Sequence, residues 1–387
     1  MLRSLYSGIS GMKNFQTKLD VIGNNIANVN TYGFKKGRVT FKDTMNQTIS
    51  GASAAQTDRG GKNPIQVGLG STISSIDTIQ TGASLQTTGR PLDLGVDGDG
   101  FFVVKQGEAE FYTRAGNLYL DDNGTLVNAD GLKVQAFKYD TTGNITNNLG
   151  DVAVNVNATL PSTKTEDINI TGNLDGNTIT GKDFIQQIEV VLDDGTAKTM
   201  DIQYKKNGAN WDVAIGGSSF TINSTGTTTP ISPTVTLTGL ITPVKITING
   251  LTQNPGAGNS AIADANGYTE GKLESFSIGS MGEISGVYSN GEIAKIGRIA
   301  LAKFSNSSGL SKAANNLFQK TVNSGEPDVK PAGNGRGTIV SGSLEMSNVD
   351  LSEEFTDMIV AQRGFQANTK IITTSDEILQ ELVNLKR

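Results

Sequence analysis

Apolar residues recur at heptad spacing at both ends of the chain, which is 387 residues long. Such a stripe on one face of a helix is typical of a helix that packs against a partner helix. The pattern therefore predicts two terminal helices that pair as a coiled coil, the first capped by Ser4 or Ser7 and ending near Asn28. The predicted interface residues of the N-terminal helix are Leu5, Ile9, Met12, Leu19, Ile22, Ile26 and Val29. Those of the C-terminal helix are Leu351, Phe355, Met358, Phe365, Ile372, Leu379 and Val383.

The charges of the two ends favour the same pairing. Residues 1–42 hold seven basic residues and one acidic residue, whereas residues 345–387 hold eight acidic and four basic residues. Opposite charge favours pairing of the two ends over self-pairing of either, although each exposed contact contributes only ~0.2–1 kcal/mol. Two unrelated surface helices with ordinary solvated faces are the alternative interpretation of the pattern.

Between the helices the pattern changes to short strands. Apolar runs at 92–96, 100–104, 111–114 and 133–137 are separated by Asp-Gly and Asn-Gly turns. A Thr- and Asn-rich block with Gly and Pro punctuation follows to about residue 267, and strand character then resumes. The fold class predicted is mainly β with terminal α-helices, in a nested arrangement of several domains.

We expect four nested parts, because strand character resumes after the Thr- and Asn-rich block and a helix lies at each end of the chain. They are a terminal coiled-coil domain (residues 1–34 and 346–387), an extended polar connector (35–75 and 325–345), an inner β-domain (76–142 and 268–324) and an outer β-domain inserted into it (143–267). Ser347 and Asp350 each begin a capping-box pattern at the start of the second helix.

Composition excludes several classes of chemistry. The chain has no Cys and no His, which removes disulfides, thiol catalysis, Ser-His-Asp catalysis and most zinc sites. No basic run is interleaved with aromatic residues, so we expect no nucleic-acid binding. No apolar stretch approaches the ~20 residues of a transmembrane helix. The N-terminus also lacks the continuous apolar core of a cleavable signal peptide.

Two motifs that resemble ligand-binding loops each lack a residue that the ligand requires. A near match to a phosphate-binding loop runs from Gly176 to Lys182, but Asp183 stands where Ser or Thr would bind magnesium. A calcium-loop-like start at Asp167 has Thr178 at the position of the bidentate Glu. We therefore expect no catalytic, cofactor-binding or metal-binding residues, and no enzyme.

Three segments of the chain resemble the bacterial flagellar rod and hook family. They are residues 7–35, residues 94–116 and residues 347–368, in that order along the chain. The resemblance covers about residues 1–142 and 268–387. The residues that carry the family motif at the two ends are Asn24, Asn25, Asn28, Asn30, Gly33, Phe34, Asn348 and Asp350.

The resemblance implies a structural subunit of the flagellar hook, a curved tubular helical polymer that acts as a universal joint between the motor and rod and the filament. The insertion at 143–267 favours the hook over the distal rod, a straight drive shaft whose subunits usually carry little or no insertion. A secreted β-rich adhesin that uses Trp211 for ligand binding is the alternative from another class. Complementary terminal helices would serve no purpose in an adhesin.

The resemblance also implies the partners and the location. Self-association gives the polymer, and the other partners implied are distal rod subunits, the hook cap, hook–filament junction proteins, the type III export apparatus and the hook-length ruler. Location in the flagellum at the cell surface follows, with export that does not cleave a signal peptide and no insertion into a membrane. The Cys-derived crosslink of some hooks is excluded, because the chain has no Cys.

Overall fold

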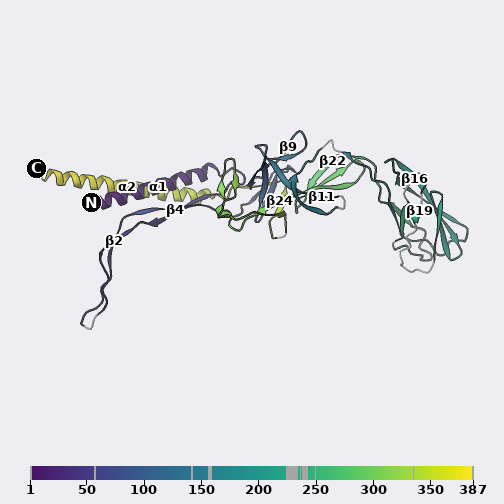
Figure 1. The fold of residues 1–387 in the computed structure, drawn as a ribbon, viewed down its shortest axis with the longest axis horizontal. Helices are drawn as coiled ribbons and strands as arrows, with labels where there is room; N and C mark the ends of the chain where they lie inside the picture. Colours follow the sequence, from purple (N-terminus) through teal and green to yellow (C-terminus); the bar gives the residue numbers. More distant parts are fainter. Residues whose placement is uncertain are drawn as a thin grey trace. The chain divides into compact units, whose positions relative to one another are not determined.

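The computed structural model describes residues 2–55, 58–140, 143–155, 159–223, 234–235, 237, 243–248, 250–333 and 335–385. Their contacts divide the chain into two compact units. Unit 1 consists of Met1–Ala153, Ile278–Ile284 and Ile296–Arg387, and unit 2 of Val154–Ser277 and Ser285–Lys295. The chain is mainly β with a helix at each end (Figure 1), which confirms the predicted fold class.

Two long helices of unit 1 lie side by side (Figure 1): α1 (Leu2–Ala27) and α2 (Leu351–Asn384). Helix α1 begins at Leu2, ahead of the serines expected to cap it. Helix α2 begins after Asp350, whose side chain accepts hydrogen bonds from the amides of Ser352 and Glu353. This N-cap satisfies backbone donors that have no partner within the helix.

Residues expected to form an extended connector instead form a β-hairpin. Strand β1 (Gly37–Asp43) pairs with β4 (Ser71–Thr78), and β2 (Asn46–Ser50) pairs with β3 (Ile65–Gly68), both antiparallel. The base of the hairpin, where β1 pairs with β4, lies along α1, and Asn14 there donates to Ser71 Oγ at 2.9 Å. Every residue of β2 and β3 is exposed.

The β-body of unit 1 contains an antiparallel sheet, and an apolar cluster packs on one of its faces. Its central path is β24-β11-β7-β8-β26-β25, and the runs that predicted strands at 100–104 and 111–114 form β7 and β8. The cluster contains Phe101, Tyr112, Phe304 and Phe318, with the Tyr112 and Phe304 ring centroids 4.8 Å apart at a near-perpendicular angle. The elements of this body are β5 (Leu85–Thr87), β6 (Leu94–Asp97), β7 (Phe101–Gln106), β8 (Ala109–Thr113), β9 (Tyr119–Leu120), β10 (Leu126–Val127), β11 (Lys133–Tyr139), β12 (Ile145–Asp151), β24 (Ile293–Lys303), η1 (Ser307–Gly309), β25 (Ser311–Lys312), β26 (Leu317–Gln319), β27 (Asp328–Pro331), β28 (Thr338–Ser341) and β29 (Ser343–Glu345).

Unit 2 contains two four-stranded sheets that share an apolar core. Their strand orders are β19-β20-β14-β21 and β15-β16-β17-β18. The single Trp211 is fully buried in this core with Tyr204 and Ile202. Unit 2 begins and ends later in the sequence than the outer domain expected at 143–267. The remaining strands are β13 (Thr159–Leu160), β14 (Asp167–Thr171), β15 (Asp183–Val191), β16 (Ala197–Asn207), β17 (Asn210–Ile215), β18 (Ser218–Ile222), β19 (Thr234–Val235), β20 (Val244–Ile248), β21 (Ile262–Ala265), β22 (Gly271–Ile278) and β23 (Glu283–Tyr288).

Candidate functional site: the terminal helix pair and its junction

The helices α1 and α2 are antiparallel and approach closely at glycines. A Cβ placed on Gly11 would lie 2.7–3.1 Å from the Asn368 side chain, and one placed on Gly364 would lie 2.5–2.8 Å from the Phe15 ring. Gly8 likewise faces Ile372. Residue numbers rise along α1 as they fall along α2, which fixes the antiparallel direction. The glycines cost helix propensity, but their lack of a side chain allows this close approach.

The structure distributes the predicted stripe residues between the helix contact and the surface. Ile22 is buried at 3% exposure. Half-buried members are Leu5, Met12, Leu19, Ile26, Val29, Met358, Phe365, Ile372 and Leu379. The exposed members are Ile9, Leu351, Phe355 and Val383.

Small and polar residues occupy the most buried positions of α2. These are Glu354, Ala361 and Ser375, and the half-buried Asn368 continues the same spacing. The buried line of α2 is therefore interleaved with the predicted apolar stripe and is not identical to it. An apolar-only pattern could not identify these positions.

Two ion pairs join the basic and acidic chain ends, as the charge distribution predicted. Lys18 Nζ lies 3.2 Å from Asp357 Oδ2, and Lys36 Nζ lies 2.7 Å from Glu353 Oε2. Both carboxylates are at least half exposed. Solvent and salt screen such pairs, so each contributes only ~0–1 kcal/mol.

A buried amide connects both helices to the base of the hairpin. The Asn25 side chain exchanges two hydrogen bonds of 2.9 Å with the backbone of Gly37 and also donates to Glu354 at 3.2 Å. Burial raises the pKa of Glu354, and this effect is opposed by the Asn25 hydrogen bond and by Lys36. One side chain thus holds α1, β1 and α2 together.

A second buried network connects the chain ends to the β-body. Glu345 at the end of β29 accepts hydrogen bonds from Lys35 Nζ at 2.7 Å, Ala83 N at 3.1 Å and Arg114 Nη1 at 3.3 Å. The side chains of Lys35 and Glu345 are fully buried and that of Arg114 is 3% exposed. Burial lowers the pKa of Lys35, against the attraction of Glu345. We call Lys35, Arg114 and Glu345 the buried triad.

Three other motif residues lie near this triad: Gly33, Phe34 and Asn348. Gly33 has φ of +70° and donates its backbone N–H to Glu345 O at 2.8 Å; a Cβ here would lie 2.6 Å from Ala115 N. Asn348 accepts from Lys36 N at 2.7 Å. Phe34 is buried. Glycine is required at position 33 because residues with a side chain rarely adopt this positive φ, and because there is no space for a Cβ.

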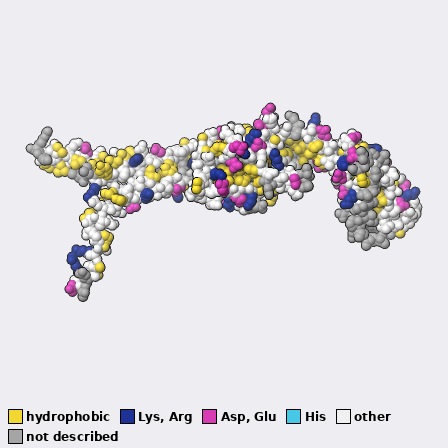
Figure 2. Space-filling view, in the orientation of Figure 1, with side chains coloured by type: hydrophobic (Ala, Val, Ile, Leu, Met, Phe, Trp, Pro, Cys, Tyr) yellow, Lys and Arg dark blue, Asp and Glu magenta, His cyan; other side chains and the backbone are white. Residues whose placement is uncertain are grey.

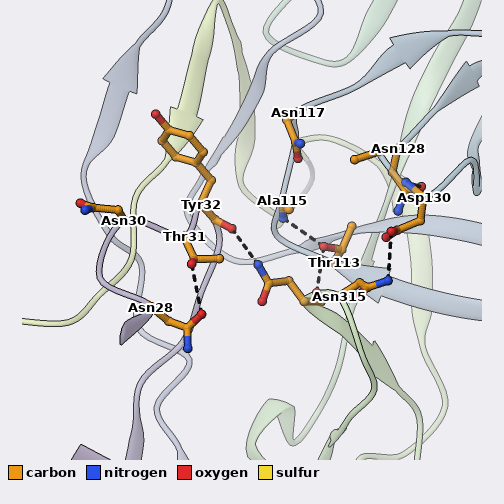
Figure 3. A pocket seen from close by; sticks show the side chains of 12 residues that line it. Asn28, Asn30, Thr31, Tyr32, Thr113, Ala115, Asn117, Asn128, Asp130 and Asn315 are labelled. Atoms are coloured by element: carbon orange, nitrogen blue, oxygen red, sulfur yellow. Dashed lines mark hydrogen bonds between the residues drawn. The ribbon is translucent and has the colours of Figure 1, made fainter. Parts of the chain in front are cut away.

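The motif asparagines that follow α1 line an open polar pocket of about 550 Å³. Asn28 and Asn30 are among its lining residues (Figure 3). Asn28 Nδ2 donates to the backbone O of Asn24 at 2.9 Å, and Asn28 Oδ1 accepts from Thr31 at 3.1 Å, which closes the end of the helix. On the opposite wall Asn315 donates to Asp130 at 3.0 Å (Figure 3). Local hydrogen bonds of this kind are typical of Asn after a helix.

The described residues offer no metal cluster and no membrane-spanning helix. Among them, no group of three or more His, Cys, Asp or Glu side chains is placed to hold a metal ion. In the same part of the chain, no helix combines the length and apolar character needed to cross a membrane. The loop-like sequence from Gly176 to Lys182 precedes strand β15, whereas a phosphate-binding loop precedes a helix.

Comparison with known proteins identifies the family. The flagellar hook protein FlgE of Borreliella burgdorferi is 40% identical to this chain over 447 residues, with 100% of both chains covered. The flagellar basal-body rod protein FlgG of Bacillus subtilis is 42% identical over 389 residues, also with 100% of both covered. This chain belongs to the flagellar hook and rod protein family.

Three family descriptions match separate parts of this hook and rod family member. Residues 5–35 match "Flagella basal body rod protein", residues 95–286 match "Flagellar hook protein FlgE/F/G D1 domain", and residues 340–385 match "Flagellar basal body rod FlgEFG protein C-terminal". A crystal structure of the Helicobacter pylori hook protein FlgE2 has a TM-score of 0.53 at 12% identity, covering 67% of this chain and 100% of that chain. At this identity the similarity supports the fold alone.

The three matched segments meet at the buried triad, because each contributes one of its residues. Lys35 belongs to the first segment, Arg114 to the second and Glu345 to the third. The hydrophobic and charge patterns of the sequence do not single out these three residues, and Glu345 enters the charge balance only as one acid among eight. A usable signal was present: each charge lies next to apolar residues, as Glu345 does between Leu344 and Met346.

Proposed function

We propose that this chain is a structural subunit of the bacterial flagellar hook, a curved tubular helical polymer that acts as a universal joint between the motor and rod and the filament. The observation that carries the proposal is the full-length similarity to hook proteins, which extends through unit 2 as well as both chain ends. The role is mechanical, and the proposal includes no catalytic step and no cofactor.

An exposed apolar stripe on α2 supports self-assembly. The exposed fractions of Val360, Ile371, Ile378 and Leu382 are 56%, 44%, 51% and 49%. At 100° per residue they lie within about 40° of one another around the helix. Figure 2 shows hydrophobic side chains at the surface of the helix pair. A row of this kind is costly in water, and a second copy of the chain would bury it.

We assign the predicted stripe residues to the same assembly. Those that lie between α1 and α2 hold the helix pair, and the exposed Ile9, Leu351, Phe355 and Val383 contact other copies. The motif residues around the buried triad then fix the helix pair to the β-body. In this proposal polar contacts between β-domains slide as the hook rotates, which suits the Thr- and Asn-rich sequence of unit 2.

The remaining partners are part of the same proposal. Distal rod subunits and hook–filament junction proteins would contact the two ends of the polymer, and the hook cap and hook-length ruler would act during its growth. The type III apparatus would export the chain without cleaving a signal peptide, which places the protein at the cell surface.

The distal rod is the second candidate, and a specific observation favours it. The FlgG rod protein is similar to this chain over its full length, so the insertion alone does not separate the two roles among the relatives. Electron microscopy of basal bodies from cells that lack the gene would decide. Complete rods without hook or filament support the hook, truncated rods support the distal rod, and intact filaments contradict both.

Ile378→Asp tests the assembly surface without disturbing the monomer. Because Ile378 is 51% exposed, the change should leave the helical circular dichroism of the unassembled chain unchanged. In the polymer it would bury a charge, so polymer yield in a sedimentation assay should fall at least about tenfold. Thr373→Asp, which adds the same charge on another side of α2, is the matched control. Equal yield from both variants and the unaltered chain would contradict the assigned surface.

A further inference from the structure

A small polar pocket in unit 1 lies beside the buried triad. Its volume is about 250 Å³, and its lining includes Gln80, Asp99, Arg114, Lys303 and Ser307. Both amide atoms of Gln80 and the Nε of Arg114 are buried without a hydrogen-bond partner among the described residues. Buried polar groups in folded proteins almost always have hydrogen-bond partners, so this concentration of unpaired groups favours a polar occupant of the pocket.

The charges around the pocket leave one positive charge uncompensated. Arg114 and Lys35 share the single carboxylate of Glu345. At the rim, Lys303 Nζ lies 3.6 Å from Asp99 Oδ2, so these two charges balance. The set therefore has three cations and two anions. A buried cation without a full counter-charge is costly, and an anion nearby would lower that cost.

The guanidinium of Arg114 is held in a fixed position. Its Nη1 donates to Glu345 at 3.3 Å, and its Cζ lies 5.1 Å from the centroid of the Phe101 ring. The side chain is only 3% exposed. A guanidinium fixed on two sides loses little conformational entropy when it binds, and its fork of donors matches a carboxylate.

We propose that this pocket is a binding site for a carboxylate, which Arg114 binds with assistance from the Gln80 amide and the rim groups Lys303 and Ser307. Asp99 opposes binding from the mouth of the pocket, where its side chain is 76% exposed. The site goes beyond the mechanical role proposed above, since it exists in the unassembled chain. The carboxylate has two possible sources: a free ion such as acetate, or an Asp or Glu side chain of a second copy.

Acetate is the probe for the first experiment, with the full unassembled chain. Acetate replaces chloride at constant ionic strength, and the Nε–H resonance of Arg114 is followed by NMR. We expect a saturable shift. Asp99→Asn, which removes the opposing charge, should bind acetate about fivefold more tightly, and Lys303→Gln about fivefold more weakly. Neither change touches the buried triad, so both variants should fold.

Asp122→Asn is the matched control, because it removes an exposed negative charge that does not line the pocket. It should bind acetate as the unaltered chain does. A shift that never saturates, or one that responds equally to all three substitutions, would overturn the proposal and leave water as the occupant. Because these titrations use unassembled protein, their failure would not affect the hook assignment.

Assembly assays distinguish the two sources of the carboxylate. If a second copy supplies it, acetate should slow polymerisation of the unaltered chain by competition, and less acetate should be needed with Asp99→Asn. If the ligand is a free ion, polymerisation should not respond to acetate while the titration of the unassembled chain remains saturable. Both results support the site and assign its ligand.

Discussion

Removing the charge of Glu345 should destabilise unit 1 far more than removing the charge of an exposed carboxylate. Glu345→Gln keeps the size and one acceptor of the side chain but leaves Lys35 and Arg114 without a counter-ion. All three side chains are 0–3% exposed. Loss of one partner from a buried ion pair costs about 3–5 kcal/mol. We therefore expect the free energy of unfolding of unit 1 to fall by about that amount.

Glu353→Gln is the matched control, because it removes the same charge from an exposed pair. Glu353 is 61% exposed and lies 2.7 Å from Lys36. Exposed pairs contribute about 0.2–1 kcal/mol, so the two substitutions should differ several-fold in their effect on the free energy of unfolding. The Lys35–Glu345 and Lys36–Glu353 distances are nevertheless equal, at 2.7 Å. Burial, not distance, decides the difference.

The assay gives each of the two units its own probe. Helical circular dichroism reports unit 1, which contains both long helices. Fluorescence of Trp211, the only Trp in the chain, reports unit 2. Urea unfolding of Glu345→Gln should shift the helical transition and leave the Trp211 transition unchanged.

A double-mutant cycle completes the test. Lys35→Met removes one of the two cations that Glu345→Gln leaves unpaired, so the double variant should be more stable than the sum of the single effects predicts. Strict additivity, or a loss below about 1 kcal/mol for Glu345→Gln, would refute the reasoning, since the reasoning assigns the cost to an uncompensated buried charge.

Three further predictions concern the helix pair. Gly23→Ala, where no atom lies within 4 Å of the new Cβ, should stabilise α1 by up to about 1 kcal/mol. Gly364→Ala should be about 1–3 kcal/mol less favourable than that control, because the new Cβ would contact Phe15. Equal effects of the two substitutions on urea unfolding would contradict the close packing of the helices. Burial raises the pKa of Glu354 above its ordinary value of 4.5, so this carboxyl contributes stability below pH 4.5 that is lost as the pH rises through the raised pKa. Glu354→Gln should therefore exceed the unaltered chain in stability at pH 7, and the gap should close on acidification; a gap that does not change with pH would contradict the assignment. Asp350→Ala should cost about 1 kcal/mol and speed hydrogen exchange in the first turn of α2, whereas Asp350→Asn should retain the cap.

The terminal helices and the central strands were predictable because their signals are local. Heptad spacing identified both helices, and the capping patterns at Ser347 and Asp350 left two candidates for the start of α2, of which the structure selects Asp350. The apolar run at 100–104 appears as β7 and the run at 133–137 as β11, because a strand buried on both faces needs apolar residues in succession.

The hairpin was missed because its two strands are distant in the sequence and polar. Strands β1 and β4 pair Val39 with Ile76 and Phe41 with Ile73, but Thr, Ser and Lys residues surround these apolar residues. No short turn joins β1 to β4, since β2 and β3 lie between them. Local turn chemistry therefore gave no indication of the pairing. In the structure, both paired strands also contact α1.

The sequence by itself determined the mainly β class, the two terminal helices, their opposite charges and the family resemblance. Only the tertiary structure decided which residues meet at the junction: Asn25 with Glu354, and Lys35 and Arg114 with Glu345. The physical reason is that hydrophobic periodicity records which side of one element is buried, averaged along that element. A buried charge is stable only beside a counter-charge, and here the two are separated by hundreds of residues in the sequence and are brought together by the fold alone.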